Sequence, residues 1–207
     1  SSMVYGDFEA APISENAKTE PLSLYGGLKL AGEVMTRAYL GGTAVERVII
    51  RPSGVYGPTD IHGRVVQAFC EGALNRGKIA IINGDATVID FTWVEDLVDG
   101  LARAATHPCA ADQTFNMTFG EGRSLEDLVR IVSTLAPGAK VVRTWVAQSG
   151  QPRRGSMDTS RARQLIGYRP VVDLETGVAR YLDFLRTKPE FPKSTLVARS
   201  AIEPAHL

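Results

Sequence analysis

Hydrophobic residues near the start of the chain follow a helical interval and then give way to a strand-like run. Over residues 21–40, apolar side chains recur every three or four positions, as on one face of a helix: Leu24, Leu28, Ala31, Met35 and Tyr39. Ser23 can cap the start of this helix, and Gly41-Gly42 ends it. The run VERVIIRP at 45–52 is rich in β-branched residues, which predicts a buried strand ending in proline.

The same two patterns alternate through the rest of the chain. Helical intervals predict helices over residues 63–76, 94–106, 159–167 and 174–187, and within 120–136. Short apolar or alternating runs predict strands at 78–82, 87–93, 114–119 and 140–145, and the Gly and Pro residues of 54–60 predict a loop. This order of elements indicates an α/β domain with a largely parallel sheet.

The elements are not equally regular along the chain. Those after about residue 60 are less regular, and we expect them to form a smaller α/β substrate-binding lobe. Residues 1–187 are expected to form one folded unit. Residues 188–207 contain three prolines and no hydrophobic period, which predicts a flexible tail.

Charge and cysteine content exclude several classes of function. Lys plus Arg equals Asp plus Glu at 23 each, so no basic surface indicates a nucleic-acid partner. No run approaches the roughly 18 apolar residues of a membrane-spanning helix. Cys70 and Cys109 lack the spacing of metal ligands, so we expect reduced thiols, no metal site and a cytoplasmic protein.

A second candidate motif follows the strand predicted at 114–119. Gly120-x-Gly122 before a helix suggests a dinucleotide fingerprint, but Leu125 occupies the place of the third glycine and no acidic residue follows at the required distance. Ser124 and Asp127 instead have the spacing of a helix-capping pair. We therefore interpret this stretch as a helix start.

Tyr25 and Lys29 are the first residues to indicate chemistry. Residues four apart share one face of a helix, so both side chains can meet one ligand. An ammonium near a phenol favours the phenolate, which can take a proton from an alcohol during hydride transfer to a nicotinamide. The two residues by themselves favour the alternative interpretation, a helix that buries the tyrosine and solvates the lysine.

The surroundings of this pair resemble one protein family. The matching stretches are SSMVYGD (1–7), PISENAKTEPLSLYGGLKLAGE (12–33), IIRPSGVYGP (49–58), NGDATVIDFTWVEDLVDGLARA (83–104), TFNMTFGEGRSLEDL (114–128) and MDTSRARQLIGYRP (157–170). In this order they are similar to the extended short-chain dehydrogenases/reductases, the NAD-dependent epimerase/dehydratase group that acts on nucleotide sugars. The resemblance implies a Rossmann-like parallel sheet, of which this chain would be the C-terminal part.

The resemblance also implies roles for individual residues. Tyr25 would be the acid/base, Lys29 would bind the nicotinamide ribose, and Ser1 would hold the reacting hydroxyl. Backbone at Pro52 and Ser53 would lie near the nicotinamide. The expected cofactor is NAD, with NADP an alternative, because the family's glycine fingerprint precedes the region that this chain matches.

Two positions beside Ser1 narrow the expected reaction. Family members that eliminate water carry Asp-Glu there and decarboxylases carry a Glu, whereas this chain has Ser2 and Met3. A nucleotide-sugar 4-epimerase is therefore expected. The alternatives are a reductase of a keto-sugar or small carbonyl compound, or a non-catalytic relative that binds a nucleotide or a protein.

Substrate contacts depart from the family pattern. The family's substrate-binding Asn is Gly54, and the Arg of its Arg-Asp-Phe motif, which often binds the diphosphate, is Ile89. Ser2 is a further expected substrate contact. We expect Arg153 or Arg154, helped by Arg64, to hold the phosphates of the nucleotide sugar; the alternative is a solvated arginine pair.

The resemblance has two consequences beyond the site. The region with the cofactor fingerprint would lie before Ser1, so we expect the chain to be the C-terminal part of a longer enzyme or to need an N-terminal partner. A homodimer is expected through the Tyr25 helix, with contacts from Leu30, Val34 and Ala38.

Overall fold

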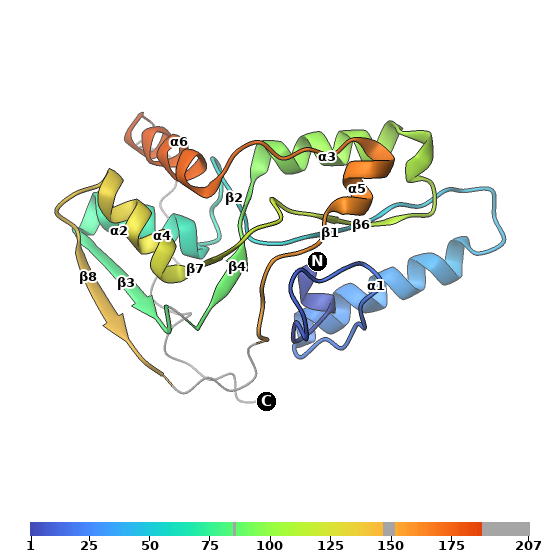
Figure 1. Cartoon of the computed structure of the whole chain (residues 1–207), viewed down its shortest axis with the longest axis horizontal. Coiled ribbons are helices and arrows are strands. Elements are labelled where there is room, and N and C mark those ends of the chain that lie inside the picture. The colour runs from blue at the N-terminus through green and yellow to red at the C-terminus, as the bar shows by residue number, and fades with distance from the viewer. Residues whose placement is uncertain (85, 147–151, 188–207) are drawn as a thin grey trace.

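The computed structural model describes residues 1–84, 86–146 and 152–187. Helices and strands follow one another along these residues (Figure 1). The helices are α1 (Leu24–Leu40), α2 (Val65–Arg76), α3 (Val94–Thr106), α4 (Leu125–Leu135), α5 (Ser160–Ile166) and α6 (Leu174–Thr187), with 3-10 turns η1 (Ser2–Val4) and η2 (Pro108–Ala110). The strands are β1 (Ile49–Pro52), β2 (Val55–Tyr56), β3 (Lys78–Ile82), β4 (Val88–Asp90), β5 (Thr92–Trp93), β6 (Thr114–Met117), β7 (Gly122–Ser124) and β8 (Lys140–Thr144). The tail predicted at 188–207 lies outside the described residues.

Most strand pairs are parallel. β1 pairs with β6, β2 with β5, and β3 with β8, all in parallel, whereas β4 and β7 are antiparallel. Parallel pairs need long crossover connections, which the helices provide. The predicted α/β class with a largely parallel sheet is therefore confirmed.

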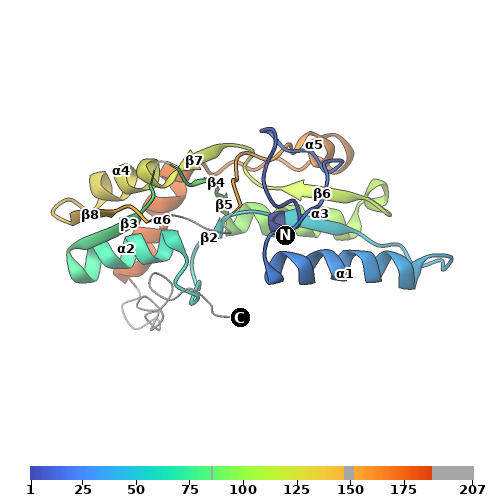
Figure 2. The same ribbon diagram turned by 90° about the horizontal axis from the view of Figure 1, so that it is seen from below.

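The elements gather at two ends of the molecule, with β2, β4 and β7 between them (Figure 1). At one end, α1 lies along one side of the β1–β6 pair and α5 lies on the other (Figure 2). Side chains of a strand alternate between its two faces. Arg51 accordingly points toward α1, whereas Ile50 and Phe115 pack toward α3 and α5.

The other end has the larger apolar core. It is built from α2, α4 and α6 around β3, and it buries Phe69, Ile79, Leu128 and Tyr181. We call this end the lobe, and the end that contains α1, β1, β6, α3 and α5 the β1–β6 end.

The chain passes between the two ends more than once. We expected the elements after about residue 60 to form the lobe together, and this boundary is wrong: α3, β6 and α5 return to β1. The strand predicted at 87–93 is also two strands, β4 and β5, which pair with different partners. A local pattern identifies a strand but not the strand with which it pairs.

Several predicted ends of elements are found where expected. Ser23 caps α1, its Oγ accepting from the Gly26 amide at 3.1 Å. Ser124 and Asp127 form a reciprocal capping box at the start of α4, which confirms the interpretation of this stretch as a helix start. The strand predicted at 45–52 is shorter, since β1 begins at Ile49 and Val45 is exposed.

Two searches of the described residues bear on partners. None of the helices described is long and apolar enough to cross a membrane. No group of three or more His, Cys, Asp or Glu side chains in the same residues could hold a metal ion.

Candidate active site

One cavity of about 820 Å³ gathers most of the predicted site residues. It lies where η1, the first turns of α1 and the end of β1 meet. The predicted residues that line it are Ser1, Ser2, Tyr25, Lys29, Pro52, Ser53, Gly54 and Arg154. Its volume is within the usual range of small-molecule sites, roughly 300–1,000 Å³.

Tyr25 and Lys29 project into this cavity from the first two turns of α1. The Lys29 ammonium nitrogen lies 5.4 Å from the centroid of the Tyr25 ring. Tyr25 is 55% exposed, so it is not the buried packing residue of the alternative interpretation. Neither side chain has an ion pair within the described part of the chain, and both are open to a ligand.

Close contact between α1 and η1 brings this pair to Ser1. A Cβ at position 26 would lie 2.4 Å from the Met3 carbonyl oxygen, so only glycine allows the helix to approach so closely. The Ser1 hydroxyl accepts a hydrogen bond from the Met3 amide at 3.3 Å, which orients it at the start of the turn. Ser1, Tyr25 and Lys29 thus line one cavity from two neighbouring elements.

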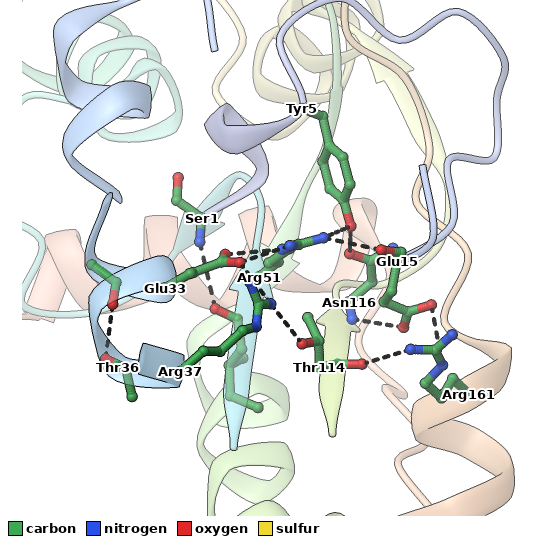
Figure 3. A network of polar contacts seen from close by, with 12 residues as sticks. Ser1, Tyr5, Glu15, Glu33, Thr36, Arg37, Arg51, Thr114, Asn116 and Arg161 are labelled. Atoms are coloured by element: carbon green, nitrogen blue, oxygen red, sulfur yellow. Dashed lines mark hydrogen bonds and ion pairs between the residues drawn. The ribbon is translucent and has the colours of Figure 1, made fainter. Parts of the chain in front are cut away.

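A buried polar network ties both elements to the strands beneath them (Figure 3). Arg51 of β1 donates to the two carboxylate oxygens of Glu33 on α1, at 2.9 and 2.7 Å. It also donates at 2.9 Å to the hydroxyl of Tyr5, which follows η1. Tyr5 in turn donates to Asn116 of β6 at 2.7 Å. Arg51 therefore holds α1 and the Ser1 turn in a common position.

The protonation states in this network follow from burial and pairing. Burial acts to raise the pKa of Glu33, but hydrogen bonds and charge from Arg51, with the charge of Arg37, outweigh it and the pKa is lowered. Glu33 is thus a carboxylate. Burial raises the pKa of Tyr5 despite the nearby Arg51 charge, so its hydroxyl stays neutral and can donate and accept.

Arg154 reaches the cavity from the segment before α5. Its Nη2 donates to Ser2 Oγ at 3.0 Å and to Ser53 Oγ at 2.8 Å. Burial lowers the pKa of Arg154, but a guanidinium keeps its proton in proteins. No carboxylate of the described residues forms an ion pair with it, so Arg154 brings to the cavity a positive charge that none of these residues pairs.

Arg153 is not brought to the cavity. Its side chain is 80% exposed and lies near Asp7, with Nε 3.5 Å from the carboxylate. Its backbone amide donates to the same carboxylate at 2.7 Å. Arg153 and Arg154 thus point to different surroundings, and only Arg154 lies where a substrate contact is possible.

The departures from the family pattern have structural counterparts. Gly54 has a φ of +51°, and a Cβ there would lie 2.5 Å from the Asp90 carbonyl oxygen. An asparagine at this position would therefore clash, and a contact at Gly54 can involve only its backbone. Ile89 lines the cavity together with Phe91 and Val66, which makes one wall apolar.

Sequence reasoning missed Glu33, which lines the cavity and accepts from Arg51. A signal was present, since Glu33 is four residues after Lys29 and eight after Tyr25, on a neighbouring part of the same helix face. Arg64, at the start of α2, lines the cavity as well and has no ion pair among the described residues. The cations at the cavity are thus Lys29, Arg64 and Arg154, whereas the carboxylate of Glu33 is already paired.

Comparison with known proteins identifies the family of this chain. A family model described as the NAD dependent epimerase/dehydratase family matches residues 1–118, more than half of the chain. The chain belongs to this family.

Individual proteins that are similar to this chain belong to the same group of enzymes by their names. A UDP-glucose 4-epimerase of Mycolicibacterium smegmatis is 34% identical over 191 residues, which cover 90% of this chain and 60% of that protein. The crystal structure of a UDP-glucuronic acid 4-epimerase from Bacillus cereus, in complex with UDP-glucuronic acid and NAD, has a TM-score of 0.82 at 26% identity, covering 90% of this chain and 59% of that one. An NAD-dependent NDP-hexosamine 5,6-dehydratase involved in tunicamycin biosynthesis has the same TM-score and identity, covering 90% and 61%. The chain thus spans about 60% of the length of the relatives that it matches.

Proposed function

We propose that this chain forms the reacting end of an NAD-dependent nucleotide-sugar 4-epimerase. The observation that carries the proposal is a single cavity that brings together Ser1, Tyr25, Lys29 and Arg154. A cavity lined by the cations Lys29, Arg64 and Arg154 suits a nucleotide sugar, whose diphosphate, and in some sugars a carboxylate, is anionic. The relatives named 4-epimerases support the choice of reaction.

The residues present fit the nicotinamide end of NAD. Lys29 has free ammonium donors at the cavity, where it would bind the ribose hydroxyls, and the backbone of Pro52 and Ser53 would lie beside the nicotinamide. When bound, NAD supplies reversible acceptance of a hydride from a sugar carbon. The glycine fingerprint for the remainder of the cofactor is outside the region that this chain matches.

Tyr25 moves the proton in the proposed reaction. Tyr25 would take the proton of the C4 hydroxyl, and the Ser1 hydroxyl would donate a hydrogen bond to the oxygen on which charge develops. Tyr25 would return the proton to the same oxygen once the configuration of C4 has been inverted. No net oxidation results, and only the configuration of one carbon changes.

Elimination of water is less well supported by this cavity. It needs an acid/base besides Tyr25 to move a second proton, and Ser2 and Met3 beside Ser1 cannot ionise in this role. Glu33 is the one carboxylate among the described residues that line the cavity, and Arg51 engages both of its oxygens. The cavity therefore favours epimerisation over the dehydratase chemistry of one relative.

Partner and location are part of the proposal. The α1 side chains that point away from the strands are exposed and apolar: Leu24, Leu28, Met35 and Tyr39. We infer a homodimer through this stripe together with Val34 and Ala38, which were predicted from sequence and are also exposed. Leu30, the third residue predicted for this contact, packs instead against the cluster of Val4 and Tyr5. The free thiols of Cys70 and Cys109 suit a reducing compartment, which supports the cytoplasm.

A matched pair of tyrosine variants tests the function. The complete protein with NAD is incubated with UDP-glucose and, separately, with UDP-glucuronate, and formation of the C4 epimer is followed by NMR. Tyr25→Phe should lower kcat by roughly 10²–10⁴-fold and leave the affinity for NAD unchanged. Lys29→Ala should lower kcat and also weaken the binding of NAD. Tyr39→Phe, on the same helix but outside the cavity, should leave kcat unchanged.

Two results would contradict the proposal. If Tyr25→Phe and Tyr39→Phe behave alike, the Tyr25/Lys29 pair is structural and the chain is a binding relative. If a keto-sugar or a small ketone is reduced while no epimer forms, the reductase alternative is correct.

A further inference from the structure

Arg154 is a half-buried cation that forms no ion pair with a carboxylate of the described residues. Its Nη2 is held by Ser2 Oγ and Ser53 Oγ, but its Nε and Nη1 make no hydrogen bond within residues 1–84, 86–146 and 152–187. Asp90 acts on Arg154 through its charge, although no ion pair joins them. A charge partly removed from water is unfavourable unless an anion meets it. The free donors of Arg154 therefore fit an anionic group of the ligand.

The two serines place the guanidinium at the reacting end of the cavity. Ser2 directly follows Ser1, which would hold the reacting hydroxyl. Ser53 directly follows Pro52, which would lie beside the nicotinamide. Since Arg154 lies within 3.0 Å of both serine hydroxyls, it is close to the carbon at which the proposed reaction occurs.

The geometry of a nucleotide sugar then decides which anionic group can reach Arg154. The diphosphate is attached to C1, which lies across the six-membered ring from C4. The substituent on C5 is next to C4 instead. In a hexose this substituent is a neutral hydroxymethyl group, and in a hexuronic acid it is a carboxylate.

Arg64 offers a separate contact for the diphosphate. It lines the same cavity from the start of α2, and its Nη1 lies 3.4 Å from the Val55 carbonyl oxygen. Its side chain is exposed and has no ion pair in the described part of the chain. Two cations at different elements of one cavity match a ligand with two separate anionic groups.

We propose that Arg154 binds a carboxylate on C5 of the sugar, so that the substrate is a nucleotide-activated hexuronic acid. This inference rests on the proposed nucleotide-sugar site. It assigns Arg154 to the sugar rather than to the phosphates, and makes it the residue that selects between a hexuronate and a hexose.

Calorimetry of the complete protein with three related ligands tests this assignment. UDP-glucuronate and UDP-glucose differ only in the C5 substituent, and UDP lacks the sugar. The wild type should bind UDP-glucuronate at least tenfold more tightly than UDP-glucose. Arg154→Leu should weaken UDP-glucuronate roughly ten- to a hundredfold and leave UDP unchanged, since the loss is that of a charged hydrogen bond.

Two further variants control for fold and charge. Arg154→Lys keeps the positive charge but not the fork of donors, and should retain part of the preference. Arg153→Leu makes the same change one residue earlier, outside the cavity, and should bind all three ligands as the wild type does. Unchanged UDP binding by Arg154→Leu shows that this variant is folded.

Several outcomes would overturn the proposal. The first is that the wild type binds UDP-glucose and UDP-glucuronate equally well. The second is that Arg154→Leu loses as much affinity for UDP as for UDP-glucuronate. The third is that none of the three ligands binds. Binding does not depend on turnover. A protein that prefers UDP-glucuronate but forms no epimer would refute the proposed reaction and support the assignment of Arg154.

Discussion

Helices α4 and α1 show that the two ends of the molecule are held together in different ways. In the lobe, α4 buries five apolar side chains, Leu125, Leu128, Val129, Ile131 and Val132, against its neighbours. At the β1–β6 end, the buried residues of α1 are Gly26 and Glu33. The lobe is held by apolar burial, and the helix with the candidate catalytic residues is held mainly by a close backbone contact and a buried ion pair.

This difference decides how each end responds to substitution. Apolar burial is spread over many contacts, so losing one side chain removes a fraction of it. The Glu33–Arg51 pair instead concentrates the attachment of α1 in one place, where removal of one partner leaves the other buried charge without its main partner. Substitutions in α1, in α4 and at Asp90, which lies between the two ends, can test this comparison.

The largest expected effect is at the Glu33–Arg51 pair. Arg51→Met should lower the free energy of unfolding by about 3–5 kcal/mol, because the Glu33 carboxylate stays buried without its bidentate partner. Arg37→Met is the control, because Arg37 is partly exposed and makes a single 3.2 Å contact with Glu33. This variant should change the free energy of unfolding by less than about 1 kcal/mol. Urea unfolding measures both, and equal effects would show that α1 does not depend on the buried pair.

The second effect contrasts apolar side chains of the two helices. Leu128→Ala in α4 should destabilise the protein by about 2–5 kcal/mol, because Leu128 is fully buried and leaves a cavity. Met35→Ala in α1 removes an exposed side chain and should change the free energy of unfolding by about 0.5 kcal/mol or less. Thermal and urea unfolding of both variants provide the measurement. A large effect of Met35→Ala at low protein concentration would mean that α1 is packed within the monomer.

The third expected effect is on the pH dependence of stability, and it involves Asp90 of β4, which lies between the lobe and the β1–β6 end. Its carboxylate accepts from the Thr118 hydroxyl at 2.9 Å and from the amides of Gly120 and Met157 at 3.1 and 2.9 Å. Burial nevertheless raises the pKa of Asp90 from 3.8 to about 6. The folded chain therefore binds this proton more tightly than the unfolded chain does. The stability from the proton is present below about pH 4 and is lost as the pH rises through about 6.

Asp90→Asn isolates this pH dependence. The free energy of unfolding of the wild type, minus that of the variant, should fall by about 2 kcal/mol between pH 4 and 7. Taking the difference cancels other titrating groups. A difference that is constant over this range would show that Asp90 does not titrate there.

The smallest effect on unfolding is expected at the exposed stripe of α1. Leu28→Gln with Met35→Gln should change the unfolding of a monomer by about 0.5 kcal/mol or less, because both side chains are exposed. In a dimer packed through α1, the same changes should convert the protein to a monomer at micromolar concentration. Sedimentation of the complete protein measures the mass, and a wild-type monomer would contradict the dimer.

Local patterns predicted much of the fold. The helices predicted at 94–106 and 174–187 have the predicted bounds, because a regular apolar stripe and clear stop signals are properties of neighbouring residues. The same holds for the caps at Ser23 and Ser124. Tyr25 and Lys29 could be paired from sequence because residues four apart must share a helix face.

The choice between Arg153 and Arg154 could not be made in this way. Both lie in an irregular segment before α5, where no period fixes the direction of a side chain. Bonds to distant residues set it instead: the Arg153 amide donates to Asp7 and its carbonyl accepts from Phe8, while the Met157 amide donates to Asp90. These partners are far away in the chain and could not be read from the neighbouring residues.

The sequence by itself determined the α/β class, most helix bounds, the Tyr25/Lys29 pair and, through its motifs, the family, since each depends on residue types at short, regular intervals. The tertiary structure alone decided that β6 returns to β1, that Glu33 is buried against Arg51, and that Arg154 rather than Arg153 lies at the cavity. These arrangements depend on which distant surfaces exclude water together and on which buried polar groups find partners. Both are properties of the whole packed chain, because a buried charge or strand edge is stable only where another part of the molecule supplies its partner.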